Sequence, residues 1–284
     1  MPTRFAPSPT GFLHLGHAYS ALTAWEICQK NDKKFILRIE DIDYQRCKVE
    51  YEQPIFQDLK WLGISWEKPI LNQKYRFNTY IEAFEILENL NLLYPCSCTR
   101  KDINQALLPS QNVSNVTNYP GTCRQRLMSE RNEADNIRLN IKKAMNYLKN
   151  VSIKKLTFTE NAYKKTKHEI NENSPYLQDD VIIARKDIGT SYHLSVVVDD
   201  AYQNITHVVR GVDLIESTPV QRLLQVILGL PEPMYHHHKL IKDNNDIKLA
   251  KRLLSKPLRS YINEGLTIAK LRNKFNLQTN QKVY

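Results

Sequence analysis

The chain has 284 residues, of which 42% are hydrophobic, so it is long enough for one large domain or two modest ones with a buried core. The chain has 40 lysines and arginines and 30 aspartates and glutamates, which gives a net charge of +10. This charge favours a polyanionic partner such as a nucleic acid, but it is also compatible with a basic protein that has no such partner. No stretch approaches the roughly 18 consecutive apolar residues of a membrane helix, and the N-terminus lacks the pattern of a signal peptide, so we expect a cytoplasmic protein without membrane contact.

The first third of the chain has the pattern of a parallel α/β unit. Residues 3–8 predict a short strand closed by prolines, residues 15–31 have the apolar spacing of a helix, and residues 33–41 predict a buried strand. In such a unit ligands bind beyond the carboxyl ends of the strands. The turn before the helix and the end of the second strand both lie at such ends.

Two amphipathic helices are predicted next, at residues 49–63 and 76–91. The stretch 95–178 is polar and has few long apolar runs, which indicates an inserted subdomain rather than more of the central sheet. After it, strand-rich runs at 179–187 and 191–211 restore the α/β pattern.

A helix is predicted from about Ser217 to residue 230, and the chain from residue 241 is short and basic. We therefore expect four segments: the first half of an α/β domain (1–94), an inserted subdomain (95–178), the second half of the domain (179–240) and a short helical C-terminal segment (241–284).

The segment PSPTGFLHLGH, residues 7–17, carries two histidines three positions apart, His14 and His17. Alone, the pair is compatible with a metal site, with solvated or core histidines, or with side chains that face a ligand. Two prolines stiffen the approach, Gly11 and Gly16 allow the backbone to come close to a ligand, and the helix offers unpaired N–H groups to an anion. Imidazoles that donate to phosphate oxygens at such a place suit a nucleoside triphosphate.

Several motifs occur in a fixed order along the chain: RFAPSPTGFLHLGH, RIEDID, VVVDD, THVVRG and KLAKR. Together they resemble the catalytic core of class I glutamyl-tRNA synthetases, over roughly residues 3–255. HLGH resembles the HIGH signature of that family, and KLAKR, residues 248–252, resembles its KMSKS loop. Ala250 stands where the family usually has serine, although both lysines remain, and a lysine-rich pentapeptide by itself is usually a solvated surface.

The resemblance implies a Rossmann-like catalytic core that uses ATP with Mg²⁺ to activate L-glutamate as an adenylate. It assigns catalytic roles to His14, His17, Lys248 and Lys251, and ATP contacts to His14, Gly16, His17 and Lys251. It assigns glutamate contacts to Arg4, Phe5, Ala6, Pro7, Ser8, Glu40, Tyr192 and Arg210. Arginines suit a dicarboxylate, and Glu40 suits the substrate ammonium. Without the resemblance, each residue would be interpreted as an internal ion pair or core hydrogen bond.

The family has one histidine, at about His237, where this chain has three in a row. No role is assigned to His236 or His238. Because consecutive strand residues point in different directions, the three are a poor metal triad.

Cys96, Cys98 and Cys123, with Tyr119, fall in the polar stretch. An odd number of cysteines without a secretion signal argues against a disulfide framework, and the spacing alone leaves open a zinc site or three structural thiols. Short relatives of the synthetase family bind zinc through CxC and YxxxC, so the resemblance implies one structural Zn²⁺ per chain on these four residues.

About thirty residues follow Arg252, too few for the helical domains with which a full glutamyl-tRNA synthetase reads the anticodon. This length and the zinc pattern resemble the short members of the family that attach glutamate to queuosine in the anticodon loop of tRNA(Asp). Two alternatives stay open: a truncated synthetase that charges a tRNA 3′ end, and a non-catalytic zinc-stapled RNA-binding protein. A monomer is expected.

Overall fold

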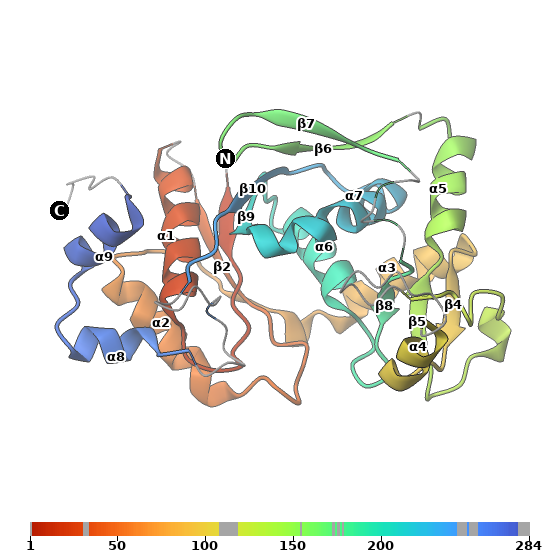
Figure 1. The fold of residues 1–284 in the computed structure, drawn as a ribbon, viewed down its shortest axis with the longest axis horizontal. Coiled ribbons are helices and arrows are strands. Elements are labelled where there is room, and N and C mark those ends of the chain that lie inside the picture. The colour runs from red at the N-terminus through yellow and green to blue at the C-terminus, as the bar shows by residue number, and fades with distance from the viewer. Residues whose placement is uncertain are drawn as a thin grey trace.

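The computed structural model describes residues 2–30, 34–107, 119–153, 155–171, 174, 177, 179–242, 249 and 255–277. Within these ranges the chain forms two sheets, with helices packed around them (Figure 1). Within these ranges, no helix is both long enough and apolar enough to cross a membrane.

The larger sheet has, among the described residues, seven strands in the order β3-β2-β1-β9-β10-β6-β7. They are β1 (Thr3–Phe5), β2 (Phe35–Ile39), β3 (Leu71–Asn72), β6 (Leu156–Glu160), β7 (Thr166–Ile170), β9 (His207–Gly211) and β10 (Met234–His238). Neighbouring strands are parallel except for the β6–β7 hairpin. The strand order reverses between β1 and β9, so their carboxyl ends diverge into a crevice where ligands bind in folds of this kind.

The second sheet is antiparallel and consists of β4 (Leu93–Cys96), β5 (Asn136–Leu139) and β8 (Ile182–Ala184). The helices are α1 (Leu15–Gln29), α2 (Glu52–Trp61), α3 (Phe77–Asn89), α4 (Arg100–Leu107), α5 (Ile141–Asn150), α6 (Tyr192–Tyr202), α7 (Thr218–Ile227), α8 (Leu258–Asn263) and α9 (Ile268–Phe275). The predicted α/β class and the helix that starts just after His14 are confirmed.

The prediction of strand over the first half of 191–211 was wrong, because this part is helix α6 and strand begins only at β9. Ser191 caps the helix, since its Oγ accepts from the N–H of Leu194 at 3.5 Å. The helix is buried on nearly all sides, including Val196, Val197 and Val198. A short run that is buried all round has no amphipathic period, so its sequence does not distinguish helix from strand.

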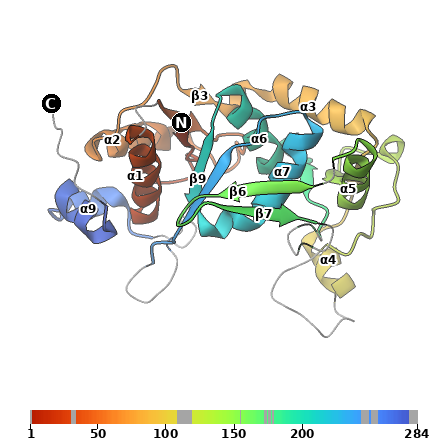
Figure 2. The same ribbon diagram turned by 90° about the horizontal axis from the view of Figure 1, so that it is seen from above.

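The expectation that 95–178 lies apart from the central sheet was also wrong in part. β6 pairs with β10, and β7 pairs with β6, so this stretch supplies one edge of the larger sheet (Figure 2). The buried side chains of the β6 and β7 strands are Leu156, Phe158 and Ile170, while the other four residues of β7 are exposed. A hairpin that buries so few apolar residues keeps a polar composition even though it belongs to the sheet.

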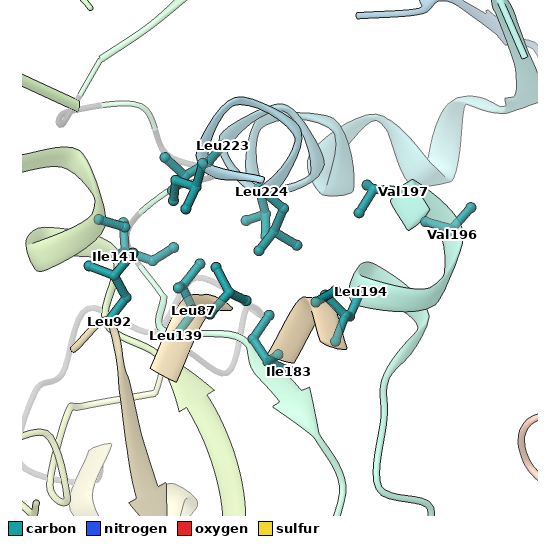
Figure 3. Close-up of a cluster of buried hydrophobic side chains, with 14 of the residues drawn as sticks. Leu87, Leu92, Leu139, Ile141, Ile183, Leu194, Val196, Val197, Leu223 and Leu224 are labelled. Carbon is teal, nitrogen blue, oxygen red and sulfur yellow. The ribbon is translucent and has the colours of Figure 1, made fainter. Parts of the chain in front are cut away.

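Two hydrophobic clusters hold these layers together. The first joins both sheets through α3, α5, α6 and α7, and Figure 3 shows Leu87, Leu139, Ile183, Leu194 and Leu224 converging in it. The second packs α1 and α2 on β1 and β2 and extends to residues of α8 and α9. The C-terminal helices thus cover the first α/β unit, beside the turn that carries the histidines.

We predict that the stability of this fold depends on pH through His207, which is buried at the start of β9. Burial lowers the pKa of His207 to about 4, against roughly 6.5 in an unfolded chain. Between these values the unfolded chain binds the extra proton, so the free energy of unfolding falls as the pH is lowered from 6.5 towards 4, by up to about 1.4 kcal/mol per pH unit. Urea unfolding at several pH values should give a shallower pH dependence for His207→Gln than for the wild type; equal slopes would contradict the prediction.

Candidate functional site

A pocket of about 310 Å³ opens at the carboxyl ends of β1 and β9. It is lined by all eight residues predicted to contact glutamate: Arg4, Phe5, Ala6, Pro7, Ser8, Glu40, Tyr192 and Arg210. His17 also lines it, whereas His14 and Gly16 lie beside it at the start of α1. Five further residues line the pocket and were not predicted from the sequence: Thr10, Ser20, Val209, Gly211 and Leu214. Ser20 lies three residues after His17 on the helix, a spacing that could have revealed it.

The two histidines of the HLGH segment cap helix α1. His14 is the N-cap residue, and its Nδ1 accepts from the N–H of Gly16 at 3.1 Å. His17 reaches back, and its Nδ1 accepts from the N–H of His14 at 3.2 Å. The ring centroids lie 3.8 Å apart. Each imidazole therefore satisfies one of the backbone donors that a helix start leaves unpaired.

This capping fixes the tautomer of both rings. A neutral imidazole whose Nδ1 accepts a hydrogen bond carries its proton on Nε2, so both Nε2 atoms are donors. Gly16 lies close to the first ring, because a Cβ atom there would lie 3.0 Å from Cε1 of His14, a contact so tight that the ring would have to shift. The arrangement explains the sequence HLGH: two capping imidazoles and a residue between them without a side chain.

Arg4 lies in a buried network of charges at the floor of the pocket. Its Nε donates to Oδ1 of Asp200 at 2.9 Å, and Nη2 of Arg38 donates to the same oxygen at 2.8 Å. Arg38 also donates to Glu40 at 3.3 Å. Burial would raise the pKa of Asp200, but Arg4 and Arg38 outweigh it and lower that pKa. Burial raises the pKa of Glu40, and the two arginines offset this only in part.

Arg210 extends from β9 into the opposite side of the pocket and is hydrogen-bonded along its whole guanidinium. Nε donates to Nε2 of His237 at 3.1 Å and Nη2 donates to Oγ1 of Thr218 at 2.7 Å. Nη1 donates to Oε1 of Gln221 at 2.7 Å and to the Tyr192 hydroxyl at 3.3 Å. The pocket thus presents one arginine on each side, both held by buried partners.

The predicted KMSKS-like residues Lys248, Ala250, Lys251 and Arg252 lie outside the described residues. The described chain after them returns to the turn that carries His14. The N–H of Leu249 donates to the carbonyl of Ile241 at 3.4 Å. Pro257 pairs with His14, and the N–H of Leu258 donates to the carbonyl of Leu13 at 2.7 Å.

A second cluster lies in the small sheet and the loop before β5. The Sγ atoms of Cys96, Cys98 and Cys123 all lie within 4.8 Å of one another. Cys98 and Cys123 are 3.5 Å apart, and the Tyr119 hydroxyl lies 3.4 Å from Sγ of Cys96. The Tyr119 ring is buried and stacks under the guanidinium of Arg138, at 3.8 Å. The structure therefore brings together all four predicted zinc ligands.

Two spacings in this cluster, Cys98–Cys123 at 3.5 Å and Cys96–Tyr119 at 3.4 Å, are close to those around a tetrahedral Zn²⁺. Zinc–sulfur bonds of about 2.3 Å place two sulfur ligands about 3.8 Å apart, and a sulfur and an oxygen ligand about 3.5 Å apart. Burial would raise the pKa of Cys123, but hydrogen bonds from Cys98, the Ser97 backbone and Tyr119 lower it to about 7. Burial and the contact with Cys123 raise the pKa of Cys98 to about 12. One thiol is thus prepared to become the thiolate that a metal binds.

Comparison with known proteins supports this description. Residues 1–277 match the family model for the catalytic domain of class I tRNA synthetases (E and Q). The chain is 42% identical to the glutamyl-Q tRNA(Asp) synthetase of Rhodobacter capsulatus, over 98% of this chain and 100% of that protein. It is 37% identical to the glutamate–tRNA ligase of Aquifex aeolicus over 93% of this chain, but spans only 54% of that protein.

Solved structures give the same result. A glutamate tRNA ligase from Elizabethkingia meningosepticum, in complex with its amino acid, superposes with a TM-score of 0.69 at 27% identity, over 88% of this chain and 52% of that one. The methionyl-tRNA synthetase of Mycobacterium tuberculosis, in complex with methionyl-adenylate, has a TM-score of 0.61 at 11% identity, over 96% of this chain and 63% of that one, and shows the fold alone.

We predict that His14 contributes to stability as a helix cap. Replacing it with alanine removes the acceptor for the Gly16 N–H and should lower the free energy of unfolding by about 1 kcal/mol. Asparagine caps helices well, so His14→Asn should keep most of this stability. Urea unfolding of both variants checks the prediction; equal losses in the two would show that the cap contributes nothing.

Proposed function

The chain belongs to the family of class I tRNA synthetases for glutamate and glutamine, and we propose that it activates L-glutamate with ATP and transfers it to queuosine in the anticodon loop of tRNA(Asp). The observation that carries the proposal is the pocket between β1 and β9, which has an arginine on each side, a carboxylate in its wall and an imidazole of the HLGH segment at its edge. Support also comes from the Rhodobacter capsulatus relative, whose full length this chain matches.

Glutamate is a dicarboxylate with an ammonium group, and the pocket offers a partner for each. Arg4 and Arg210 each donate to carboxylate oxygens. For Arg4 the nitrogen directed at the substrate is Nη2, because Nε contacts Asp200 and Nη1 contacts the carbonyl of Val209. Glu40 pairs with the ammonium, and this pairing favours the ionised carboxylate that burial otherwise disfavours.

Activation follows from the position of the histidines beside this pocket. The α-carboxylate oxygen of glutamate attacks the α-phosphorus of ATP, an O–P bond forms, and the bond to the β-phosphate breaks and releases pyrophosphate. His14 and His17, whose Nε2 atoms are donors, stabilise charge on the phosphate oxygens. Lys248 and Lys251 neutralise the pyrophosphate, and Mg²⁺ accompanies the ATP.

In the second step, a hydroxyl of the queuosine cyclopentene ring attacks the activated carbonyl, an ester forms, and AMP leaves. This acceptor is favoured over a tRNA 3′ end because the chain is 42% identical to the glutamyl-Q tRNA(Asp) synthetase of Rhodobacter capsulatus, compared with 37% for the glutamate–tRNA ligase of Aquifex aeolicus. The net charge of +10 accords with a tRNA substrate. We further propose that the enzyme acts as a cytoplasmic monomer.

We also propose that Cys96, Cys98, Tyr119 and Cys123 hold one structural Zn²⁺. Four protein ligands leave no open position for a reacting water, so the ion would staple the chain and take no part in the reaction. The cluster has little apolar surface of its own, since its described members are three cysteines, two tyrosines and one isoleucine. A metal would supply the cohesion that such a small cluster lacks.

We predict that labelled glutamate and ATP will label tRNA(Asp) from cells that make queuosine and will leave tRNA(Asp) from cells that cannot make it unlabelled. The reason is that the acceptor hydroxyl belongs to the modified base. Acid-precipitable label, followed by nuclease mapping of the labelled nucleotide, is the measurement. His17→Ala serves as the inactive control, because it loses a donor to the phosphate.

Label on the 3′ end of tRNA(Glu) would instead identify a truncated charging enzyme. Absence of glutamate-dependent ATP–pyrophosphate exchange would reject catalysis.

We predict that the purified chain contains about one zinc ion per molecule by metal analysis. Cys98→Ser should lower the zinc content and lower the melting temperature by roughly 5 °C or more, because a ligand and its cross-link are lost. Cys47→Ser is the matched control, since Cys47 lies outside the cluster and hydrogen-bonds the carbonyl of Glu40. A wild-type chain that is free of zinc and equally stable would refute the site.

A further inference from the structure

The carboxylate of Glu160 is connected to Arg210 through one imidazole. Glu160 is the last residue of β6, and its Oε2 is in hydrogen-bond contact with Nδ1 of His237 on β10. Nε2 of the same ring lies 3.1 Å from Nε of Arg210 and 3.1 Å from Oγ1 of Thr218. The His237 ring is buried. Strand β6 of the polar insertion is therefore connected to Arg210 in the wall of the pocket through the side chains of Glu160 and His237.

The hydrogen bonds determine the protonation of the ring. Nε of Arg210 is always a donor, so Nε2 of His237 must accept. Oγ1 of Thr218 accepts from Nη2 of Arg210, which leaves its own proton for the same Nε2. The single proton of a neutral ring must then lie on Nδ1, where it is donated to Glu160. Burial lowers the pKa of His237 more than the contact with Glu160 raises it, which keeps the ring neutral near pH 7.

Glutamate, and not glutamine, is required to hold this tautomer. Oε1 of Glu160 accepts three backbone N–H groups, from Asn161 at 3.0 Å, Ala162 at 2.9 Å and His237 at 3.1 Å. In a glutamine, the carbonyl oxygen would have to occupy that place, and the NH₂ group would face Nδ1. His237 would then accept at Nδ1 and carry its proton on Nε2, pointing at the N–H of Arg210.

The orientation of Arg210 matters because few of its donors remain for a ligand. Of its five N–H groups, the contacts to described residues use one on Nε, two on Nη1 and one on Nη2. The remaining donor lies on Nη2, and the plane of the guanidinium decides where it points. Rotation of this plane would misdirect the hydrogen bond to a carboxylate.

We propose that Glu160 is a positioning residue for substrate recognition: it fixes the tautomer of His237, which fixes the guanidinium of Arg210 against the carboxylate of the amino acid. The inference rests on the proposed function insofar as Arg210 binds glutamate. It also gives the β6–β7 hairpin a role in the active site, because the hairpin places Glu160 beside β10.

The first test is the tautomer itself, measured by long-range ¹H–¹⁵N correlation on the full chain with ¹⁵N-labelled histidine. The His237 signal is assigned by its loss in His237→Gln. The wild type should carry the proton on Nδ1, and Glu160→Gln should carry it on Nε2. A wild-type ring protonated on Nε2 overturns the proposal, even if no variant of Glu160 folds.

The second test is glutamate-dependent ATP–pyrophosphate exchange. Glu160→Gln should raise the KM for glutamate at least tenfold and change the KM for ATP less than twofold, because only the carboxylate contact is misdirected. Glu169→Gln is the matched control, since Glu169 lies in the same hairpin, pairs with Lys155 on the surface and should leave both constants unchanged.

A double-substitution cycle shows whether the effect passes through the imidazole. In the His237→Gln background, Glu160→Gln should change the KM for glutamate less than twofold further. Independent effects that multiply, or an equal rise of both KM values with a lower melting temperature, would reduce Glu160 to a structural role and overturn the proposal. Absence of glutamate-dependent exchange in the wild type would reject the proposed function instead, while the tautomer measurement would still decide this inference.

Discussion

The substrate pocket depends on one buried carboxylate, that of Asp200, which contacts Arg4 and Arg38 at the same oxygen. The Arg38 side chain is completely buried, and an unpaired guanidinium there would cost several kcal/mol. Asp200 makes this burial tolerable and also fixes Arg4, while Nη2 of Arg38 donates to Glu40 as well. Two of the charged residues that line the pocket, Arg4 and Glu40, are therefore positioned by Asp200 and Arg38, which do not line it. Residues from β1, β2 and α6 meet here, so the pocket exists only when the sheet and α6 have assembled.

Two neighbouring carboxylates of α6, Asp199 and Asp200, make contacts with different parts of the molecule. Asp199 accepts from Gln73, from Arg76 and from the hydroxyl of Tyr80, and so attaches α6 to α3 and the turn before it. Asp200, one residue later, points to the pocket instead, because successive helix positions are separated by about 100°. The motif VVVDD is thus a buried apolar face followed by two differently directed carboxylates. The same segment serves the core and the site.

The sequence predicted those parts of the site that depend on local structure. The turn from Pro7 to His17 was found from its prolines, glycines and histidines, since strand ends and helix starts have local signatures. Tyr192 and Arg210 were assigned only through the family resemblance, because nothing local marks residues that meet across the sheet. The roles of Asp200 and Glu160 were not predicted at all. Their partners lie 196 and 77 positions away, and such pairings are decided by strand order. The strand assigned to VVVDD was wrong because a segment buried nearly all round has no amphipathic period. The separate insertion was wrong in part because the β6–β7 hairpin buries few apolar residues and so keeps a polar composition.

The histidines of HLGH and the thiols of the insertion are both sets of metal ligands by residue type, and the fold gives them different chemistry. Nδ1 of each histidine accepts a backbone N–H, so these atoms serve the helix, and the Nε2 atoms become donors that repel a cation. The three thiols lie close to one another, and the Tyr119 hydroxyl, which also accepts the N–H of Cys123 at 2.8 Å, contacts Cys96. The Cys98–Cys123 and Cys96–Tyr119 distances are close to those around a tetrahedral ion. The two histidines therefore present donors to an anion because of the backbone groups that they cap, whereas the thiols face one another as ligands of a metal would. In this protein a helix start suits a phosphate, and a cluster of mutually facing donors suits a metal ion.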